Sequence, residues 1–336
     1  MEANNNLKYD ALNSINMMER GAATLNGNLL VYIKTESATS YLLKIKFDND
    51  GNRIVSDTIK VFTGDKPSDP SRLKAVIEYT QSQYPAQSYG LVLWSHATSW
   101  APANNKVSVR SFGSDNGTEM DIKALKNALP NNFEYIIFDA CSMGSVEVLY
   151  EFKDKAKYLI ASPTETLAES YPYQTITPLL FNSAEQLSTL AKAYFDYYNS
   201  YTDERRSASV VLVKSSELET LAAQANKLFK NYKKSGDRLI SSGVQRLDYT
   251  SGFPVPNYDF TDFLDHNFST NQLDEIKGQL NKTVLYKSAT PEFLGTNIQK
   301  FSGLSCYIPF PGDVNFNYYQ QLSWYTASGM PVLFGN

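Results

Sequence analysis

The architecture of this chain follows from residues 133–150, which read FEYIIFDACSMGSVEVLY. The run is rich in aromatic and β-branched residues, as a buried strand is, until it reaches Asp139. From Gly144 onward the apolar residues recur at helical spacing. The stretch therefore predicts a strand, a tight turn that contains Cys141, and a helix. Because open α/β sheets place ligands and chemistry at the carboxyl ends of their strands, we expect the Cys141 thiol to be presented at that edge.

A second short apolar run lies upstream and ends next to a histidine. Residues 89–94 read YGLVLW, which is typical of a strand covered on both faces, and Ser95 and His96 follow it. The chain has two cysteines and two histidines, and one of each stands directly after a predicted strand. An imidazole beside a thiol can take its proton or stabilise the thiolate, which makes the sulfur a better nucleophile. His96 and Cys141 are therefore the predicted catalytic dyad.

The two runs and their separation resemble the clostripain-like cysteine peptidases, which belong to the same clan as caspases, legumains and gingipains. The resemblance continues through residues 158–165 (YLIASPTE), 258–264 (YDFTDFL) and 303–310 (GLSCYIPF), where the last would be a closing strand, and it covers most of the chain. It implies an α/β fold, a three-layer α/β/α caspase-like sandwich with a mostly parallel central sheet. It also implies one peptidase domain over residues 1–336, with an extra helical C-terminal portion around 215–290.

Elsewhere the apolar patterns alternate between strand and helix periods, as expected of a layered α/β fold. Residues 118–121 resemble a capping box for a helix that ends at Leu129. Two helices are predicted between residues 258 and 286, with an apolar face that includes Val284. The other predicted elements are helices at 7–20, 184–199 and 216–233, a helix that begins at 68–70, and strands at 28–34, 41–47, 53–62, 157–162 and 209–214.

Composition narrows the class of partner. The chain has 336 residues, of which 42% are hydrophobic and 20% charged, as in a globular protein with a substantial core. Its net charge of -4 gives no basic field for nucleic acid or an anionic membrane. No stretch approaches the ~20 apolar residues of a membrane span. We therefore expect no nucleic-acid partner and no membrane span, whereas a peptide or protein substrate is what the resemblance implies, and we expect the chain to be a monomer.

No metal site is predicted. Cys306 lies within an apolar run and is expected to be a small buried side chain, and His266 has no carboxylates or histidines at metal spacing around it. The Asp/Asn-rich run at 48–52 lacks the acidic series and the final glutamate of an EF-hand, so a turn is the better interpretation. Thiol chemistry requires no cofactor. Calcium is implied by the resemblance alone, and no ligands can be assigned to it.

The resemblance assigns further roles around the dyad. Members of the family usually have a glycine after the histidine, whose backbone N–H helps to form the oxyanion hole together with that of the nucleophile, here Cys141. This chain has Ala97 there, which keeps the N–H but has less access to positive φ. Thr164, in the polar loop after the strand at 157–162, is a predicted substrate-binding residue.

Asp139 precedes the cysteine by two residues and should point to the same side of the strand as Cys141. The resemblance implies that this aspartate helps to select Arg or Lys on the acyl side of the cleaved bond, and a carboxylate accepts two hydrogen bonds from a guanidinium. The alternative is that Asp139 caps the helix that follows, where the dipole favours a negative charge.

Residues 97–117 are polar and lack periodicity, which in a compact domain indicates a functional or mobile loop. The resemblance implies that cleavage there after a basic residue activates the enzyme, with Lys106 and Arg110 as the candidates. The alternative is a surface loop with two ordinary cations.

These assignments predict a cysteine endopeptidase that cleaves after Arg or Lys through an acyl-enzyme. Two alternatives stay open. One is a degenerate scaffold that binds peptides or proteins, suggested by Ala97 and by a start, MEANNNLKYD, in which the family's first strand is not visible. The other is transfer of the acyl group to an amine. No export signal is visible in this chain, but the resemblance implies an extracytoplasmic or secreted protein.

Overall fold

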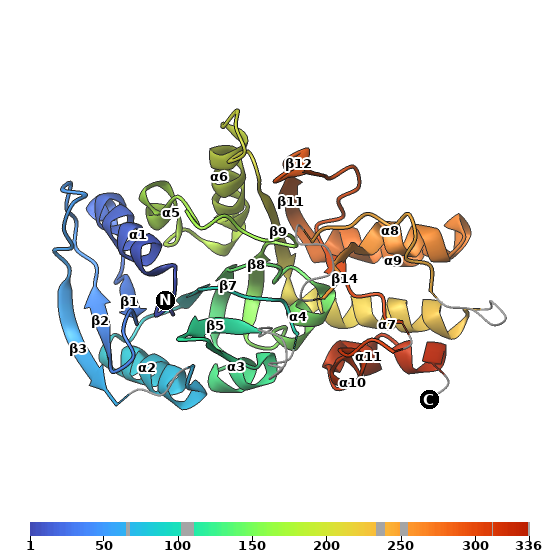
Figure 1. The fold of residues 1–336 in the computed structure, drawn as a ribbon, viewed down its shortest axis with the longest axis horizontal. Helices are drawn as coiled ribbons and strands as arrows, with labels where there is room; N and C mark the ends of the chain where they lie inside the picture. The colour runs from blue at the N-terminus through green and yellow to red at the C-terminus, as the bar shows by residue number, and fades with distance from the viewer. Residues whose placement is uncertain (65–67, 102–110, 233–238, 249–254, 311, 335–336) are drawn as a thin grey trace.

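The computed structural model describes residues 1–64, 68–101, 111–232, 239–248, 255–310 and 312–334. Its centre is a five-stranded sheet in the order β11-β9-β8-β7-β4. The strands are β4 (Tyr89–Trp94), β7 (Phe133–Asp139), β8 (Ala156–Ala161), β9 (Ser209–Lys214) and β11 (Val284–Ala289). β4, β7 and β8 run parallel, whereas β9 is antiparallel to both of its neighbours. The sheet is mixed and largely parallel, which confirms the predicted fold class (Figure 1).

Helices cover both faces of this sheet, because the side chains of each strand alternate between two apolar cores. Ile136 and Phe138 lie in a core that we call the α4 core, whereas Ile137 lies in the opposite one, the α1 core. The α4 core takes residues from α3 (Ile122–Ala128), α4 (Val146–Glu151), α7 (Leu218–Lys230), α8 (Phe260–Asn267), α9 (Thr270–Thr283) and α11 (Ser323–Ala327). The α1 core takes them from α1 (Lys8–Gly21), α5 (Tyr173–Leu179) and α6 (Leu187–Asn199).

A separate three-stranded antiparallel sheet flanks α1 and α2 (Pro70–Gln83) at one end of the molecule (Figure 1). Its strands are β1 (Leu30–Ile33), β2 (Thr39–Lys44) and β3 (Asp57–Thr63). Residues 1–3 connect this sheet to the central one, because Ala3 N–H donates to the carbonyl of Lys34 and Glu2 N–H donates to the carbonyl of Trp94. The first residues of the chain thus lie at the carboxyl end of β4.

The remaining elements are short. Two-stranded pairs are formed by β5 (Phe112–Asp115) with β6 (Thr118–Met120), β10 (Tyr258–Asp259) with β14 (Ser305–Cys306), and β12 (Glu292–Phe293) with β13 (Thr296–Asn297). Helix α10 spans Phe316–Tyr319, and 3-10 helices lie at Ala22–Thr24, Ala184–Gln186, Ser215–Glu217 and Met330–Phe334.

Three details of the sequence prediction were wrong. The capping box at 118–121 does not form, because Thr118 belongs to β6 and Asp121 caps α3 by accepting from the N–H groups of Lys123 and Ala124. The predicted second helix ends at Thr283, and Val284 begins β11 of the central sheet. The stretch 303–310 contributes only β14, which pairs with β10 outside the central sheet.

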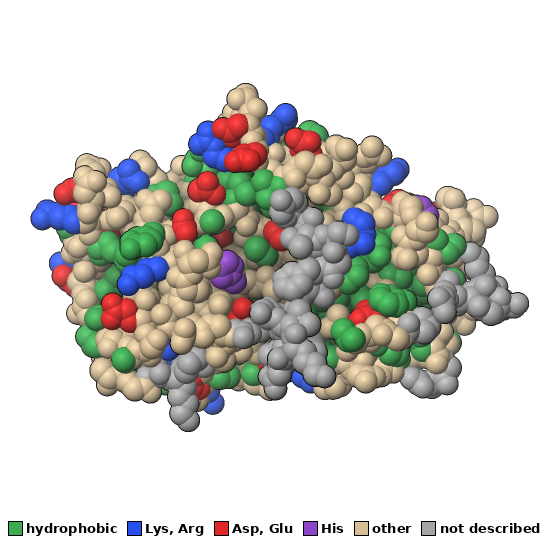
Figure 2. Space-filling view, viewed as in Figure 1, with side chains coloured by type: hydrophobic (Ala, Val, Ile, Leu, Met, Phe, Trp, Pro, Cys, Tyr) green, Lys and Arg blue, Asp and Glu red, His purple; other side chains and the backbone are tan. Residues whose placement is uncertain are grey.

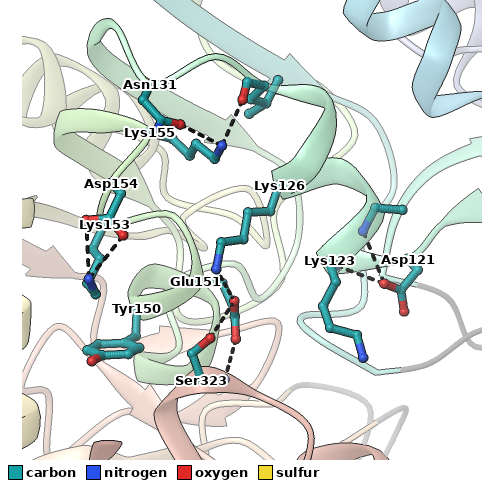
Figure 3. A network of polar contacts seen from close by, with 12 residues as sticks. Asp121, Lys123, Lys126, Asn131, Tyr150, Glu151, Lys153, Asp154, Lys155 and Ser323 are labelled. Atoms are coloured by element: carbon teal, nitrogen blue, oxygen red, sulfur yellow. Dashed lines mark hydrogen bonds and ion pairs between the residues drawn. The ribbon is translucent and has the colours of Figure 1, made fainter.

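The carboxyl end of α4 is tied to two other elements through one buried carboxylate. Figure 3 shows Lys126 of α3 and Ser323 of α11 pointing toward Glu151. Glu151 is 2% exposed and accepts from Lys126 Nζ at 2.7 Å and from both the backbone N–H and the hydroxyl of Ser323. The helix that follows the cysteine turn is therefore fixed to the C-terminal segment.

Candidate active site

His96 and Cys141 lie at the same edge of the central sheet. In the parallel pairing of β4 and β7, Trp94 is opposite Asp139, so each dyad residue comes two positions after the same pair. Both side chains are half-buried. The apolar runs that predicted the two strands thus bring the imidazole and the thiol to one edge, as expected for the chemistry of an α/β sheet.

The turn that carries Cys141 packs closely on the loop after β8. Ser142 N–H donates to the carbonyl of Thr164 at 2.8 Å, and Gly144 N–H donates to the carbonyl of Ser162 at 2.8 Å. A Cβ at Gly144 would lie 2.6 Å from the backbone nitrogen of Pro163, so only glycine permits this approach. The loop after β8 thereby fixes the position of the Cys141 turn.

Thr166, which the sequence analysis did not single out, contacts the thiol. Its N–H donates to Cys141 Sγ at 3.3 Å, and its hydroxyl lies 3.6 Å from the sulfur. Thr164, the predicted binding residue, is fully buried, and its hydroxyl is held by those of Ser162 and Ser209. The Thr164 side chain therefore does not face a substrate in this arrangement, because it completes the packing beneath the loop.

His96 receives its hydrogen-bond partner from the start of the chain. Its Nε2 lies 2.8 Å from Oδ1 of Asn6, which precedes α1. The backbone beside it is also anchored: Ser95 Oγ donates to the carbonyl of Glu2 and accepts from Ser114 N–H. No sequence signal indicated Asn6, because the contact joins residues far apart in the chain.

Two backbone N–H groups near the dyad are available to a substrate oxygen. Ala97 lies opposite Phe112 in an antiparallel bridge whose hydrogen bonds run through the flanking residues, so its own N–H points away from Phe112. Within the described part of the chain, the N–H groups of Ala97 and Cys141 donate to no other group. The φ angle of Ala97 is not positive, so this backbone does not require a glycine.

Asp139 is 4% exposed and lies over the α1 core. Its carboxylate accepts from the hydroxyl of Tyr173 at 2.7 Å and from that of Ser170, which itself accepts from Trp94 Nε1 at 2.6 Å. Burial raises its pKa to about 6, although the two hydroxyl donors act in the opposite direction. The alternative that Asp139 caps α4 was wrong, because the N-cap is Ser145, whose hydroxyl accepts from Val148 N–H.

Residues 1–325 match the model of the Clostripain family. The chain belongs to this family of cysteine proteases. Clostripain from Hathewaya histolytica is 23% identical over 98% of this chain and 76% of that protein.

Two solved structures are similar over nearly their whole length. An inactive zymogen C11 protease from Parabacteroides distasonis has a TM-score of 0.84 and 30% identity, covering 97% of this chain and 95% of that one. A secreted C11 cysteine protease from Bacteroides thetaiotaomicron, in complex with an irreversible peptide inhibitor, has a TM-score of 0.83 and 28% identity, covering 98% and 97%.

Burial shifts the pKa values of Cys141 and His96 in this clostripain-family protease. Burial raises the pKa of the Cys141 thiol, and the negative charge of Glu165 raises this pKa further. The hydrogen bonds with Thr166 act in the opposite direction. Burial also lowers the pKa of His96, whereas the negative charge of Asp10 raises it by a smaller amount. Both directions favour a neutral thiol and a neutral imidazole at this edge of the sheet.

Acidic side chains gather around this edge of the sheet. The negative charge of Glu169 raises the pKa of Asp10, and the charge of Asp10 raises that of His96. The charge of Glu165 likewise raises the pKa of Cys141. In Figure 2 a histidine near the middle of the view has acidic side chains around it. The edge therefore presents a negative field to an approaching peptide.

The other candidates lie apart from this edge or outside the described residues. Lys106 and Arg110, the predicted processing sites, are not among the described residues. Cys306 is buried and unpaired, as predicted. Among the residues that the structure describes, no group of three or more His, Cys, Asp or Glu side chains could hold a metal ion. In the same residues, no helix is both long and apolar enough to cross a bilayer.

Proposed function

We propose that this clostripain-family protease is an endopeptidase that cleaves after Arg or Lys through the dyad of His96 and Cys141. The observation that carries the proposal is the register of β4 with β7, which places both residues after one strand pair, with the Asp139 carboxylate two positions before the sulfur. Such an arrangement supplies a nucleophile, a base and an acidic specificity group at one edge.

Each proton has a defined route in the proposed reaction. His96 takes the proton of the Cys141 thiol while the sulfur attacks the scissile carbonyl, and the resulting oxyanion accepts hydrogen bonds from the N–H groups of Ala97 and Cys141. The imidazolium then protonates the leaving amine as the C–N bond breaks. Water, activated by the neutral His96, hydrolyses the thioester and releases the second product. No cofactor takes part in these steps.

Selectivity for a basic side chain is proposed to reside in Asp139. A guanidinium or ammonium that reaches this carboxylate would lower its pKa and keep it ionised, because an opposite charge favours the charged form. Ser170 and Tyr173 orient the carboxylate by donating to it. The acidic neighbours Asp10 and Glu169 would attract a basic peptide before it binds.

Activation and location are proposed by analogy. The similar protease from Parabacteroides distasonis is described as an inactive zymogen, and that from Bacteroides thetaiotaomicron as secreted. We infer that this chain also acts outside the cytoplasm, and that cleavage after Lys106 or Arg110 in the loop at 97–117 activates it.

Fluorogenic peptides that carry Arg, Lys or Gln before the cleaved bond test the proposal. The wild-type enzyme is assayed directly and after limited trypsin treatment followed by trypsin inhibitor. We expect turnover of the Arg and Lys peptides, none by Cys141→Ala, and full turnover by Cys306→Ala, the matched change at the buried cysteine. Absence of turnover by the wild type in both forms would instead favour a degenerate peptide-binding scaffold.

Asp139→Asn separates selectivity from folding. Loss of a charge-assisted contact should lower kcat/KM for the Arg peptide by about 100-fold, which corresponds to about 2.7 kcal/mol, and should leave kcat/KM for the Gln peptide unaffected.

The Asp139→Asn variant should also be more stable than the wild type at pH 8. A buried carboxyl with a pKa of about 6 and an ordinary value of 3.8 opposes folding by up to about 3 kcal/mol above pH 6. This gain should shrink to about half a kcal/mol at pH 4 and vanish below about pH 3, where the carboxyl of the unfolded chain is also largely protonated.

A further inference from the structure

The contact between Asn6 and His96 assigns a role to a residue that carries no catalytic signal in the sequence. Asn6 Oδ1 lies 2.8 Å from His96 Nε2, across a separation of 90 residues. An amide oxygen can only accept a hydrogen bond, so this nitrogen of the imidazole must be the protonated one. The neutral ring then has its lone pair on Nδ1.

The segment that carries Asn6 is held in place by its two neighbours. Asn4 Nδ2 donates to Asp115 Oδ1 at 2.7 Å, and Asn5 Nδ2 donates to the carbonyl of Ser114. Asp115 is fully buried and forms an ion pair with the equally buried Lys34. Asp115 is therefore a fixed attachment point for the segment. It belongs to β5, the strand whose first residue, Phe112, pairs with Ala97.

We propose that Asn6 is a positioning residue that holds neutral His96 in the Nε2–H tautomer, so that Nδ1 is the atom that takes the proton of Cys141. The inference rests on the proposed function and deepens it. When the S–C bond forms, the thiol proton passes to Nδ1, and it leaves from the same nitrogen to the amine as the C–N bond breaks. Nε2–H stays bound to Asn6 throughout.

A neutral acceptor suits this position. The Asn6 oxygen stabilises the imidazolium that forms during the reaction, but it adds no full charge that would protonate the ring beforehand. Asp10 already supplies a nearby negative charge that favours the imidazolium. An amide therefore fixes the tautomer and leaves the base free to accept a proton.

The second histidine provides an internal reference for the test. His266 Nδ1 lies 2.8 Å from the backbone carbonyl of Asp262, so it must carry the proton, and His266 has the opposite tautomer. The chain contains only these two histidines. Two-bond 1H–15N correlation spectra of the full chain, labelled with 15N-histidine and recorded at pH 8, should show one ring of each tautomer.

Asn6→Ala should convert the His96 signals to a mixture of tautomers and leave those of His266 unchanged. In the peptide assay the same variant should lower kcat about 10- to 100-fold with KM nearly constant, because substrate binding is not altered. Asn6→Asp, which keeps an acceptor oxygen but adds a charge, should restore the Nε2–H bond while favouring the imidazolium, so its kcat should recover only at a pH higher than the wild type requires. Asn52→Ala, at an exposed asparagine in the turn between β2 and β3, should match the wild type in both measurements.

The Nδ1–H form for His96 in the wild type would overturn the proposal, as would an Asn6→Ala variant with unaltered kcat. The spectra do not depend on turnover, so failure of this inference is distinguishable from failure of the proposed function. An inactive wild type with the Nε2–H form would contradict the peptidase proposal but would support the assigned tautomer. An active wild type with the Nδ1–H form would contradict only the role of Asn6.

Discussion

Burial acts on the two dyad side chains in opposite directions. It raises the pKa of the Cys141 thiol and lowers that of the His96 imidazole. A cysteine enzyme that relied on a preformed thiolate would require the reverse, since a nearby imidazolium lowers the pKa of a thiol. The free protein should therefore contain a neutral thiol and a neutral imidazole, and in the proposed reaction the thiol proton moves only when the sulfur attacks a substrate.

Alkylation of the free enzyme measures this state. The rate of iodoacetamide reaction at Cys141 should keep rising with pH beyond pH 9, because the reactive thiolate forms only above the raised pKa. Mass spectrometry locates the adduct, and Cys141→Ala should not be labelled, because Cys306 is buried and its pKa is also raised. A rate that reaches its plateau below pH 7 would show a preformed thiolate and imidazolium and would contradict the prediction.

The sequence predicted that His96 and Cys141 lie at one edge of the sheet, because each directly follows a nearly continuous apolar run. It could not predict Asn6, Thr166 or Ser170, because their roles depend on contacts between segments far apart in the chain. Thr164 and Thr166 illustrate the limit. Both lie in a polar loop without periodicity, and only the packing of that loop under the cysteine turn decides which hydroxyl lies beside the sulfur.

At the scale of elements, α4 has only one and a half turns and cannot hold the cysteine turn by its own hydrogen bonds. Its position depends on contacts at both ends. Ser145 caps its first turn, and Glu151 binds Lys126 and the start of α11 at its last (Figure 3). The turn that contains Cys141 is thereby fixed through contacts at both ends of α4.

Removal of the Glu151 carboxylate should destabilise the protein. Glu151→Ala is expected to lower the free energy of unfolding by about 2–4 kcal/mol, because it leaves the N–H of Ser323 and the ammonium of Lys126 without their partner. Urea denaturation followed by circular dichroism measures the loss. Glu275→Ala removes an exposed carboxylate that pairs with Lys227, and should cost less than about 1 kcal/mol. Equal losses in the two variants would contradict the prediction.

Periodicity predicted the long elements well and failed where two elements share one pattern. The strands β4 and β9 have the predicted bounds. β11 was missed because the helical spacing of Leu273, Ile276 and Leu280 continues to Val284. α5 was missed because Pro172 and Pro178 indicate a loop, although Pro172 stands at its N-cap and the helix ends right after Pro178.

On the scale of the whole molecule, the two apolar cores lie on opposite faces of one sheet and share its strands. The C-terminal portion at 215–290 supplies both the helices α7 and α9 and the edge strand β11. Its helices cover the α4 core, and its strand pairs with β9 over the whole of Ser209–Val213. This portion is built into the sandwich, and a single domain stays the prediction.

One cooperative unfolding transition is therefore expected. Far-ultraviolet and near-ultraviolet circular dichroism should give coincident curves in urea, because loss of the α7–α9 layer exposes the face of the central sheet that it covers. Cys141→Ala should be used, so that the proposed self-cleavage does not complicate the measurement. Two separate transitions would show that the C-terminal portion unfolds on its own and would contradict a single domain.

Trp94 is linked to the proposed specificity carboxylate through the hydroxyl of Ser170. The indole N–H of Trp94 donates to this hydroxyl, which donates to Asp139. The other two tryptophans, Trp100 and Trp324, are fully buried in the α4 core on the opposite face of the sheet. Intrinsic fluorescence thus contains one emitter that is hydrogen-bonded to the partner of Asp139 and two that lie in the core on the other face of the sheet. A basic inhibitor could be titrated optically against the unlabelled enzyme.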